Sequence, residues 1–183
     1  LSISGSSAAN KTYDGNASAT ILSGVIATGV GSETLAISGT GMFSDKNAAL
    51  DKMVTVADVS TLIKADGTGL WNNYNLTSTG PITTTANIDK KNVTLDRIAA
   101  ANKLYDGTAE ATITSGEISG GIGNETLLIS GKGNFSDPAP GTNKTVTVTG
   151  VSKLAKTNGT GDWNNYNLIT SGSMSSIATI TAK

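Results

Sequence analysis

The chain has 183 residues, of which 37% are hydrophobic and only 15% are charged, and its formal net charge is −1. No cluster of Lys and Arg exceeds a pair, and no apolar run approaches the roughly 18 residues that span a bilayer, so we expect no nucleic-acid partner and no membrane insertion. Cys and His are both absent. Their absence excludes disulfides, Cys and His nucleophile systems, and zinc or haem sites with these ligands, so we expect no cofactor, no metal and no catalysis.

An internal repeat is the most informative feature of the sequence. Residues 11–15 (Lys-Thr-Tyr-Asp-Gly) return as residues 103–107 (Lys-Leu-Tyr-Asp-Gly), and the same shift of 92 positions aligns the whole chain without a gap. Such a period indicates an array of similar units. We expect two domains, residues 1–91 and 92–183, each large enough for a small core. Because the shift pairs Lys91 with the last residue, we also expect the chain to be a piece of a longer array.

The first elements of each repeat predict strands joined by tight turns. Thr, Val and Ile favour strands, whereas frequent Gly, Asn and Asp supply turns, so we expect an all-β fold. Alternating residues predict an opening strand at 1–4 and again at 93–96. An Asp-Gly dipeptide then predicts a turn directly after a strand that ends in tyrosine. The residues of this structural motif are Tyr13, Asp14 and Gly15 in the first repeat, and Tyr105, Asp106 and Gly107 in the second.

The middle of each repeat predicts further strands. Residues 17–21 and 109–113 read as half-buried strands, and retained glycines punctuate short strands around Ile26 and around Leu35 and Ile37. The repeats diverge most at 46–50 and 138–142, which we expect to be a surface loop. The strongest strands are 52–56 and 144–148, with valines on one face and threonines on the other. A bend is expected directly after them.

The last part of each repeat contains the longest identical run, Trp-Asn-Asn-Tyr-Asn-Leu, at 71–76 and 163–168. We expect Tyr74 and Tyr166 to point inward from a strand. A closing strand at 85–88 is followed by the four-residue link 89–92, which has no Gly or Pro. So short a link favours a stiff, elongated rod of two modules.

The order of these motifs resembles the YDG repeat family, which is related to the mostly-β glycine-rich (MBG) repeats. Lys-x-Tyr-Asp-Gly, Phe-Ser-Asp, Lys-x-Val-Thr-Val, Asn-Tyr-x-Leu and Ala-x-Ile occur in this order in 11–88 and again in 103–180. Such repeats are found in large bacterial surface proteins, including filamentous-haemagglutinin-like adhesins. The resemblance implies an extracellular location on a Gram-negative cell and a stalk function, in which repeats project a separate adhesive region.

Two alternatives assign chemistry to particular side chains. Exposed tryptophans with flanking amides would suit a host or matrix glycan or a protein partner; the candidate contacts are Trp71, Asn72, Asn73, Trp163, Asn164 and Asn165. The structural alternative is a tryptophan that covers one end of the module while the asparagines make a turn. An isopeptide bond is also conceivable between Lys52 or Lys144 and Asn75 or Asn167.

The sequence therefore predicts two tandem small β-sandwich modules of Ig-like type. A β-grasp-like module is the alternative fold, because about 90 residues leave room for a short helix. The expected function is a stalk or spacer, and its expected partners are the neighbouring repeats of the same chain. The alternative function is a glycan- or protein-binding module.

Overall fold

The computed structural model describes residues 1–183 apart from residues 2, 4, 29 and 78–79. The chain divides into two compact units, Leu1–Lys90 and Lys91–Lys183, so the boundary lies one residue before the expected one. The last strand of the first unit ends at Asp89, and the first strand of the second begins at Lys91. The link between the strands is therefore Lys90 alone, shorter than the four residues expected.

The described residues of the first unit form a seven-stranded sheet. Its strands are β1 (Ser7–Ala8), β2 (Lys11–Thr12), β3 (Ser18–Ala27), β4 (Thr34–Phe43), β5 (Ala49–Val56), β6 (Ile63–Asp66) and β7 (Ile82–Asp89). The order across the sheet is β1-β3-β4-β5-β7-β2, and β6 pairs with β4. Pairing is antiparallel except between β2 and β7, which run parallel.

The second unit repeats this architecture with eight strands. They are β8 (Lys91–Ala100), β9 (Lys103–Leu104), β10 (Glu110–Ser119), β11 (Leu127–Phe135), β12 (Gly141–Val148), β13 (Ala155–Asn158), β14 (Tyr166–Leu168) and β15 (Met174–Thr181). The order is β14-β8-β10-β11-β12-β15-β9, and β13 pairs with β11. The strands β14 and β9 pair in parallel with β8 and β15 respectively.

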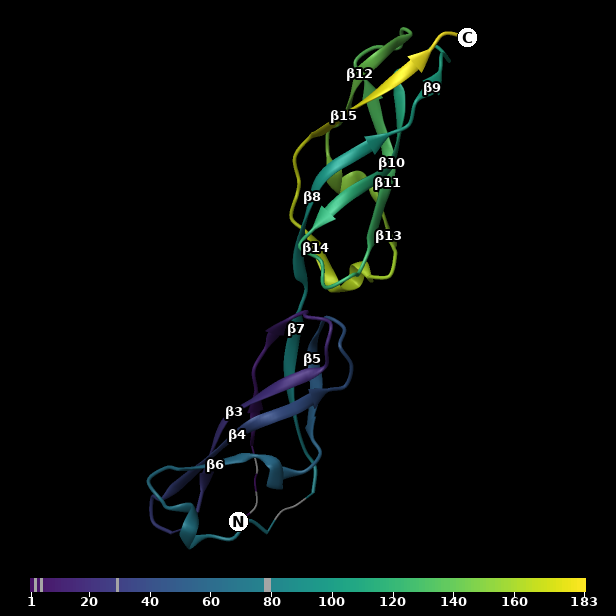
Figure 1. The fold of residues 1–183 in the computed structure, drawn as a ribbon. Helices are drawn as coiled ribbons and strands as arrows, with labels where there is room; N and C mark the ends of the chain where they lie inside the picture. Colours follow the sequence, from purple (N-terminus) through teal and green to yellow (C-terminus); the bar gives the residue numbers. More distant parts are fainter. Residues whose placement is uncertain (2, 4, 29, 78–79) are drawn as a thin grey trace. The chain divides into compact units, whose positions relative to one another are not determined.

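Helical residues occur only as single 3-10 turns in the part of the chain that the structure describes (Figure 1). These turns are η1 (Val59–Thr61), η2 (Trp71–Asn73), η3 (Val151–Lys153) and η4 (Trp163–Asn165). The all-β prediction is confirmed. The short α-helix allowed by the β-grasp alternative is not found among the described residues.

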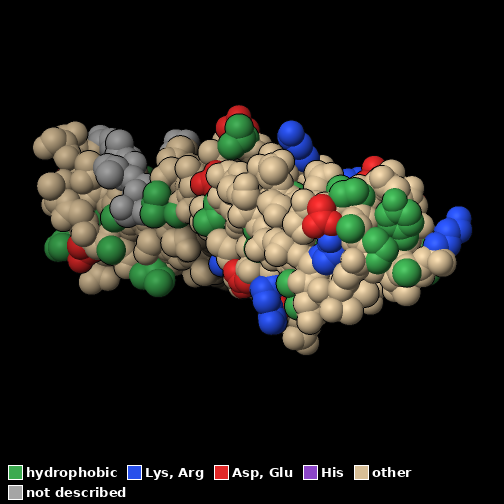
Figure 2. All heavy atoms as spheres, turned by 90° about the horizontal axis from the view of Figure 1, so that it is seen from above, with side chains coloured by type: hydrophobic (Ala, Val, Ile, Leu, Met, Phe, Trp, Pro, Cys, Tyr) green, Lys and Arg blue, Asp and Glu red, His purple; other side chains and the backbone are tan. Residues whose placement is uncertain are grey.

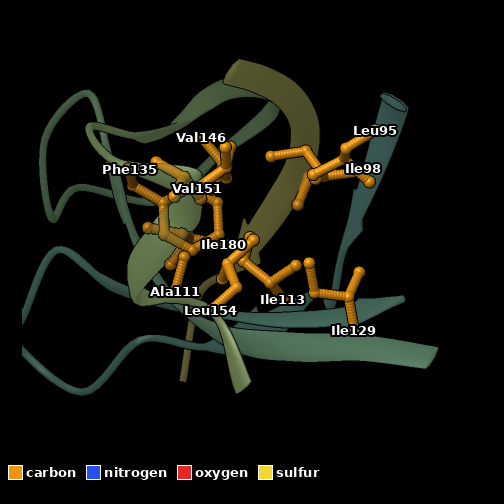
Figure 3. Packing of buried hydrophobic residues seen from close by; sticks show 12 residues of the cluster. Leu95, Ile98, Ala111, Ile113, Ile129, Phe135, Val146, Val151, Leu154 and Ile180 are labelled. Atoms are coloured by element: carbon orange, nitrogen blue, oxygen red, sulfur yellow. The ribbon is translucent and has the colours of Figure 1, made fainter. Parts of the chain in front are cut away.

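The core of the second unit is a cluster of aliphatic side chains with one aromatic ring, Phe135. Figure 3 shows side chains from β8, β10, β11, β12 and β15 converging on one another. Val146 and Val148 are buried on β12, whereas Thr147 between them is partly exposed and Thr145 before them is exposed. Each such aliphatic side chain contributes roughly 1.5–3 kcal/mol when it leaves water. The alternation predicted for 144–148 is therefore what directs this strand's valines into the core.

The first unit buries the corresponding residues. Val54 and Val56 are at most 3% exposed, as are Leu35, Ile37 and Phe43 from β4. The bend expected after the valine strand is confirmed, because η1 and η3 follow β5 and β12 directly and bury Val59 and Val151. Each unit thus has hydrophobic side chains enough for a core of its own.

Two strand predictions differ from the structure, and a third falls partly outside the described residues. The strands expected at 17–21 and 109–113 continue much further, as β3 and β10. Residues 166–168 form the strand β14, but residues 74–76 form none. Of the opening strand expected at 1–4, positions 2 and 4 lie outside the described residues, whereas 93–96 lie within β8 as predicted.

In each unit the chain enters at one end and leaves at the opposite end (Figure 1). In the second unit the entering residues Lys91–Val93 pair with β14, and the leaving residues Ile180 and Thr181 pair with β9, both in parallel. In the first unit Leu1 donates through its amino group to the Asn75 carbonyl at 2.8 Å. At the other end β7 pairs in parallel with β2. Both ends of each unit are therefore held by hydrogen bonds to another segment of the same unit.

The two units differ in how far the third strand of the repeat pairs with the strand that follows it. In the first unit β3 pairs with β4 from Ser18–Met42 to Ala27–Thr34, with a register shift between Ile21 and Gly24. In the second unit the ladder of β10 with β11 ends at Ile113–Gly131. Through its other edge β10 pairs with β8, as β3 pairs with β1.

Candidate functional site

The Lys-x-Tyr-Asp-Gly segment forms a tight corner after a two-residue strand in both units. Gly15 has φ +81° and Gly107 has φ +78°, a left-handed conformation that glycine adopts without a steric penalty. Asp106 Oδ1 accepts a hydrogen bond from the Thr108 amide at 2.9 Å, and Asp14 makes the equivalent bond to the Asn16 amide at 3.1 Å. The predicted Asp-Gly turn is therefore present in both repeats.

The lysine of this segment forms hydrogen bonds to residues on both sides of the glycine in the turn. Lys103 Nζ donates to Asp106 Oδ1 at 2.8 Å and to the Thr108 carbonyl at 2.9 Å, and it lies 5.7 Å from the centre of the Phe135 ring. The hydrogen bond from Lys103 lowers the pKa of Asp106 well below its usual range. Lys11 makes the equivalent contacts with Asp14 in the first unit. The motif thus joins its own corner to the Phe of the Phe-Ser-Asp motif.

The two tyrosines of the motif have different environments. Each donates its backbone N–H to the leaving strand at 2.8 Å, Tyr13 to Asp89 and Tyr105 to Thr181. However, Tyr13 is 2% exposed and Tyr105 is 41% exposed. The expectation that both rings anchor a core is therefore wrong for Tyr105, whose ring lies at the surface beside the exposed Leu104.

The tryptophans of the longest identical run point inward. Trp71 and Trp163 are each 9% exposed. The Trp163 indole N–H donates to the Leu128 carbonyl at 3.0 Å, and the Trp71 indole N–H lies 3.1 Å and 2.9 Å from the carbonyls of Ala36 and Ala65. Each indole therefore closes the region where two strands of its sheet meet.

A lysine lies over each of these rings. Lys64 Nζ is 5.4 Å from the centre of the Trp71 ring, and Lys156 Nζ is 5.2 Å from that of Trp163, distances typical of cation–π contacts. The tryptophans are consequently not the exposed platform that the glycan-binding alternative requires. Asn72, Asn73 and Asn164 are exposed, but Asn165 is buried.

The tyrosines of the same run bind a glutamate from a distant turn. Tyr166 donates its hydroxyl to Glu125 Oε2 at 2.5 Å and accepts from the Ile122 amide at 3.1 Å. Burial, followed by the Glu125 carboxylate, raises the pKa of Tyr166 to about 12. Tyr74 makes the corresponding hydrogen bond to Glu33, and this bond raises the pKa of Tyr74. A tyrosine and a carboxylate that hold a loop in place account for the motif without a ligand.

The lysines considered for an isopeptide bond have other partners. Lys52 Nζ lies 2.7 Å from Asp45 Oδ1 although the Lys52 side chain is only 7% exposed, and Lys144 pairs with Asp137. Asn75 uses its carbonyl to bind the N-terminal amine, and Asn167 donates its amide to Asn92. These contacts join neither lysine to Asn75 or Asn167, so they give no support to the isopeptide alternative.

Several residues are identical in the two repeats at an interval of 92 positions, but sequence reasoning did not assign them the structural roles that they have. They are Asn10 and Asn102, Glu33 and Glu125, and Lys64 and Lys156. Asn10 and Asn102 each accept an amide hydrogen bond at 2.8 Å from the leaving strand, from Asn87 and Thr179 respectively. Identity between the repeats was the available signal, because a side chain that fixes the fold must be present in both.

Chemistry-bearing clusters are scarce in the part of the chain that the structure describes. It contains no group of three or more Asp and Glu residues arranged to hold a metal ion. No helix there combines the length and the apolar character of a membrane span. A hollow of about 450 Å³ lies at the surface between β8 and β10 and is lined by Arg97, Ile98, Ala99, Ser115, Gly116 and Glu117.

Comparison with known proteins gives one family. The sequence profile of the YDG domain matches residues 1–84 and again residues 89–174, so the two matches correspond to the two structural units. Neither the curated proteins nor the solved structures contain a match. The two profile matches together cover most of the chain, and on this basis the chain belongs to the YDG domain family.

Proposed function

We propose that this chain is a pair of stalk repeats from a large secreted bacterial adhesin, which lies outside the cell and holds a separate adhesive region away from the surface. The observation that carries the proposal is the path of the chain through each unit. It enters at one end and leaves at the other, and both ends are tied by hydrogen bonds to segments of the same unit (Figure 1).

This path gives a physical basis for carrying load. If the ends of a unit are pulled apart, the parallel bridges of β14 with β8 and of β9 with β15 must slide, so several hydrogen bonds are strained together. Each backbone hydrogen bond contributes about 1 kcal/mol net, and cooperative rupture raises the barrier above that of one bond. The Asn102 side chain adds a further tie between the segment before β9 and the leaving strand.

The surface is compatible with a spacer. Figure 2 shows small groups of charged side chains, some of opposite sign next to each other, and groups of hydrophobic side chains among uncharged polar side chains and backbone on the face in view. With 15% charged residues and a net charge of −1, the chain has little long-range attraction for a charged partner. We further propose that each curled sheet forms a small sandwich of the Ig-like type, since β8 and β15 both supply side chains to the same core.

Single-molecule force spectroscopy tests the stalk proposal. We expect two separate unfolding events, each releasing about 90 residues, or about 300 Å of extended chain before the folded length is subtracted. Asn102→Ala should lower the unfolding force of one event, and Asn10→Ala that of the other. Unfolding of both units without measurable resistance would refute a load-bearing role, whatever the outcome of any binding assay.

A further inference from the structure

The end of β13 contains the single Asn-Gly dipeptide of the sequence, Asn158-Gly159. Asn158 is the last residue of the strand, and it is exposed. In such a dipeptide the glycine has no side chain that keeps its backbone nitrogen away from the preceding side-chain amide. Asn-Gly pairs therefore lose ammonia and close to a cyclic imide more readily than other asparagine pairs, and water then opens the imide.

The packing of the second unit requires the glycine of this dipeptide. A Cβ at Gly159 would overlap the hydroxyl and carbonyl oxygens of Thr126, and one at Gly67 in the first repeat would overlap the corresponding threonine. The residue before the glycine differs, however, because it is Asp66 in the first repeat and Asn158 in the second. The first repeat thus carries at this position the residue that deamidation of the second would produce.

Both residues make the same contact with the tryptophan that follows them. Asn158 Oδ1 accepts a hydrogen bond from the Trp163 amide at 2.9 Å. In the first unit Asp66 Oδ1 accepts from the Trp71 amide at 2.7 Å. The Trp163 amide lies on the oxygen that gains negative charge when the Gly159 nitrogen attacks the side-chain carbon, and a donor placed there stabilises that charge. The fold therefore accommodates the product and favours the step that leads to it.

The residue four positions further on differs between the repeats. Asn158 Nδ2 donates to Asp162 Oδ1 at 3.1 Å, whereas the first repeat has Leu70 at the position of Asp162. Residues 66–70 and 158–162 therefore contain one carboxylate each. Deamidation would give the second segment two carboxylates in contact, and their like charges repel.

We propose that Asn158 is a self-modification site, which converts the second unit from an amide form to an acid form while the unit is folded. The Gly159 nitrogen bonds to the side-chain carbon of Asn158, and the amide nitrogen leaves as ammonia with the proton that Gly159 gives up. Water then opens the imide to aspartate or isoaspartate. Both products place a new charge near Asp162, and isoaspartate also lengthens the backbone by one atom where Gly159 packs on Thr126.

Peptide mapping by mass spectrometry tests the proposal, because the change from amide to acid adds about 1 Da. The folded protein is incubated at mildly alkaline pH beside the same protein held unfolded in denaturant. We expect residue 158 of the folded protein to react at least about tenfold faster than any other asparagine, and within about tenfold of its own rate in the unfolded chain. A folded rate further below the unfolded one would overturn the proposal, since the fold would then protect the amide.

Two variants are matched controls for this rate. Asn158→Gln keeps an amide but lengthens the side chain, so the gain in mass at this position should disappear. Asp66→Asn creates the same dipeptide in the first unit, next to the Trp71 amide, and should add a second reactive site with a similar rate. An unreactive site there would refute the part assigned to the tryptophan amide.

The effect of the new charge is measured on Asn158→Asp, which represents the aspartate product. We expect the Trp163 amide to exchange with solvent deuterium about fivefold faster in this variant, because the two carboxylates repel each other. Adding Asp162→Asn removes one charge and keeps an oxygen that can cap η4, so the exchange rate should return to that of the unsubstituted protein. Equal rates in all three proteins would overturn the proposed effect on the turn.

Discussion

The two units have the same order of motifs, yet they differ at two places. In the first, Tyr13 is buried and the ladder of β3 with β4 continues to Ala27–Thr34; in the second, Tyr105 is exposed and the ladder of β10 with β11 ends at Ile113–Gly131. The shared elements are those in which a side chain is fixed by several partners, such as Lys103 with Asp106, Thr108 and the Phe135 ring. Retained side chains therefore define the corner and the core, whereas the length of the ladder between two neighbouring strands differs from one unit to the other.

The largest expected effect is a loss of stability in one unit that leaves the stability of the other unit unchanged. Trp163→Ala should destabilise the second unit by about 3–5 kcal/mol, because it removes a buried ring and leaves the Leu128 carbonyl without its indole donor. Trp71→Ala should do the same to the first unit. Each variant retains one tryptophan, so the fluorescence of that residue reports the unit that was not altered.

In a denaturant titration, the transition of the remaining tryptophan should keep the midpoint it has in the unsubstituted protein. A shift of that midpoint by the cost of the substitution itself would mean that the two units unfold as one. Hydrogen exchange measured by mass spectrometry should localise the loss of protection to the altered unit.

A smaller effect is expected at the tyrosine that holds the Glu125 turn. Tyr166→Phe should cost the second unit about 1–2 kcal/mol, because both the Glu125 carboxylate and the Ile122 amide lose a partner. The folded pKa of about 12 is above the unfolded value of about 10. The stability from this hydroxyl is therefore fully present below pH 10 and is lost as the pH rises through 12.

Thermal unfolding from pH 8 to pH 12 checks this prediction. The unsubstituted second unit should lose stability toward the upper end of the range more steeply than Tyr166→Phe. If both proteins have the same alkaline profile, the hydroxyl contributes no linked stability. The matched Tyr74→Phe variant should affect only the first unit.

The smallest effect is expected at the Asp-Gly corner. Asp106 has a lowered pKa in the folded state, first because of the Lys103 hydrogen bond, so its contribution is present above the unfolded pKa and is lost as the pH falls through the folded one. Asp106→Asn should therefore reduce the melting temperature at pH 7 and should have progressively less effect below pH 4. Melting curves of Asp106→Asn and Asp14→Asn across this range test whether the two corners are equivalent; an effect that grows toward low pH would contradict the assignment.

Local features of the fold could be predicted from the sequence. The alternation of Val and Thr at 144–148 predicts a strand with one buried face, and the Asp-Gly dipeptide predicts the corner after Tyr105; both are found. These features depend on the period of the backbone and on the conformations that glycine permits, which a short segment determines by itself. The all-β class follows from the same local preferences.

The partners and the environments of particular residues could not be predicted in the same way. The sequence does not show how far β10 pairs with β11, because the first repeat continues the corresponding ladder to Ala27–Thr34 whereas the second ends it at Ile113–Gly131. Trp163 is buried by contacts with Lys156 and with Leu128 of β11, which lies 35 positions away along the chain. Identical tyrosines with 2% and 41% exposure show that a motif defines a turn more firmly than it defines what surrounds the ring.

The opposite placement of entry and exit in each unit has a consequence for how such genes change. Duplication of one complete 92-residue period adds a whole unit, and loss of one period removes a whole unit. In both cases the strands of the other units keep their own partners. The cut can fall at Lys90, the one residue between β7 and β8, without interrupting a ladder. Unequal recombination between repeats can therefore lengthen or shorten the encoded protein in whole modules, so allelic size variation in steps of one period is the form of diversity that this architecture tolerates best.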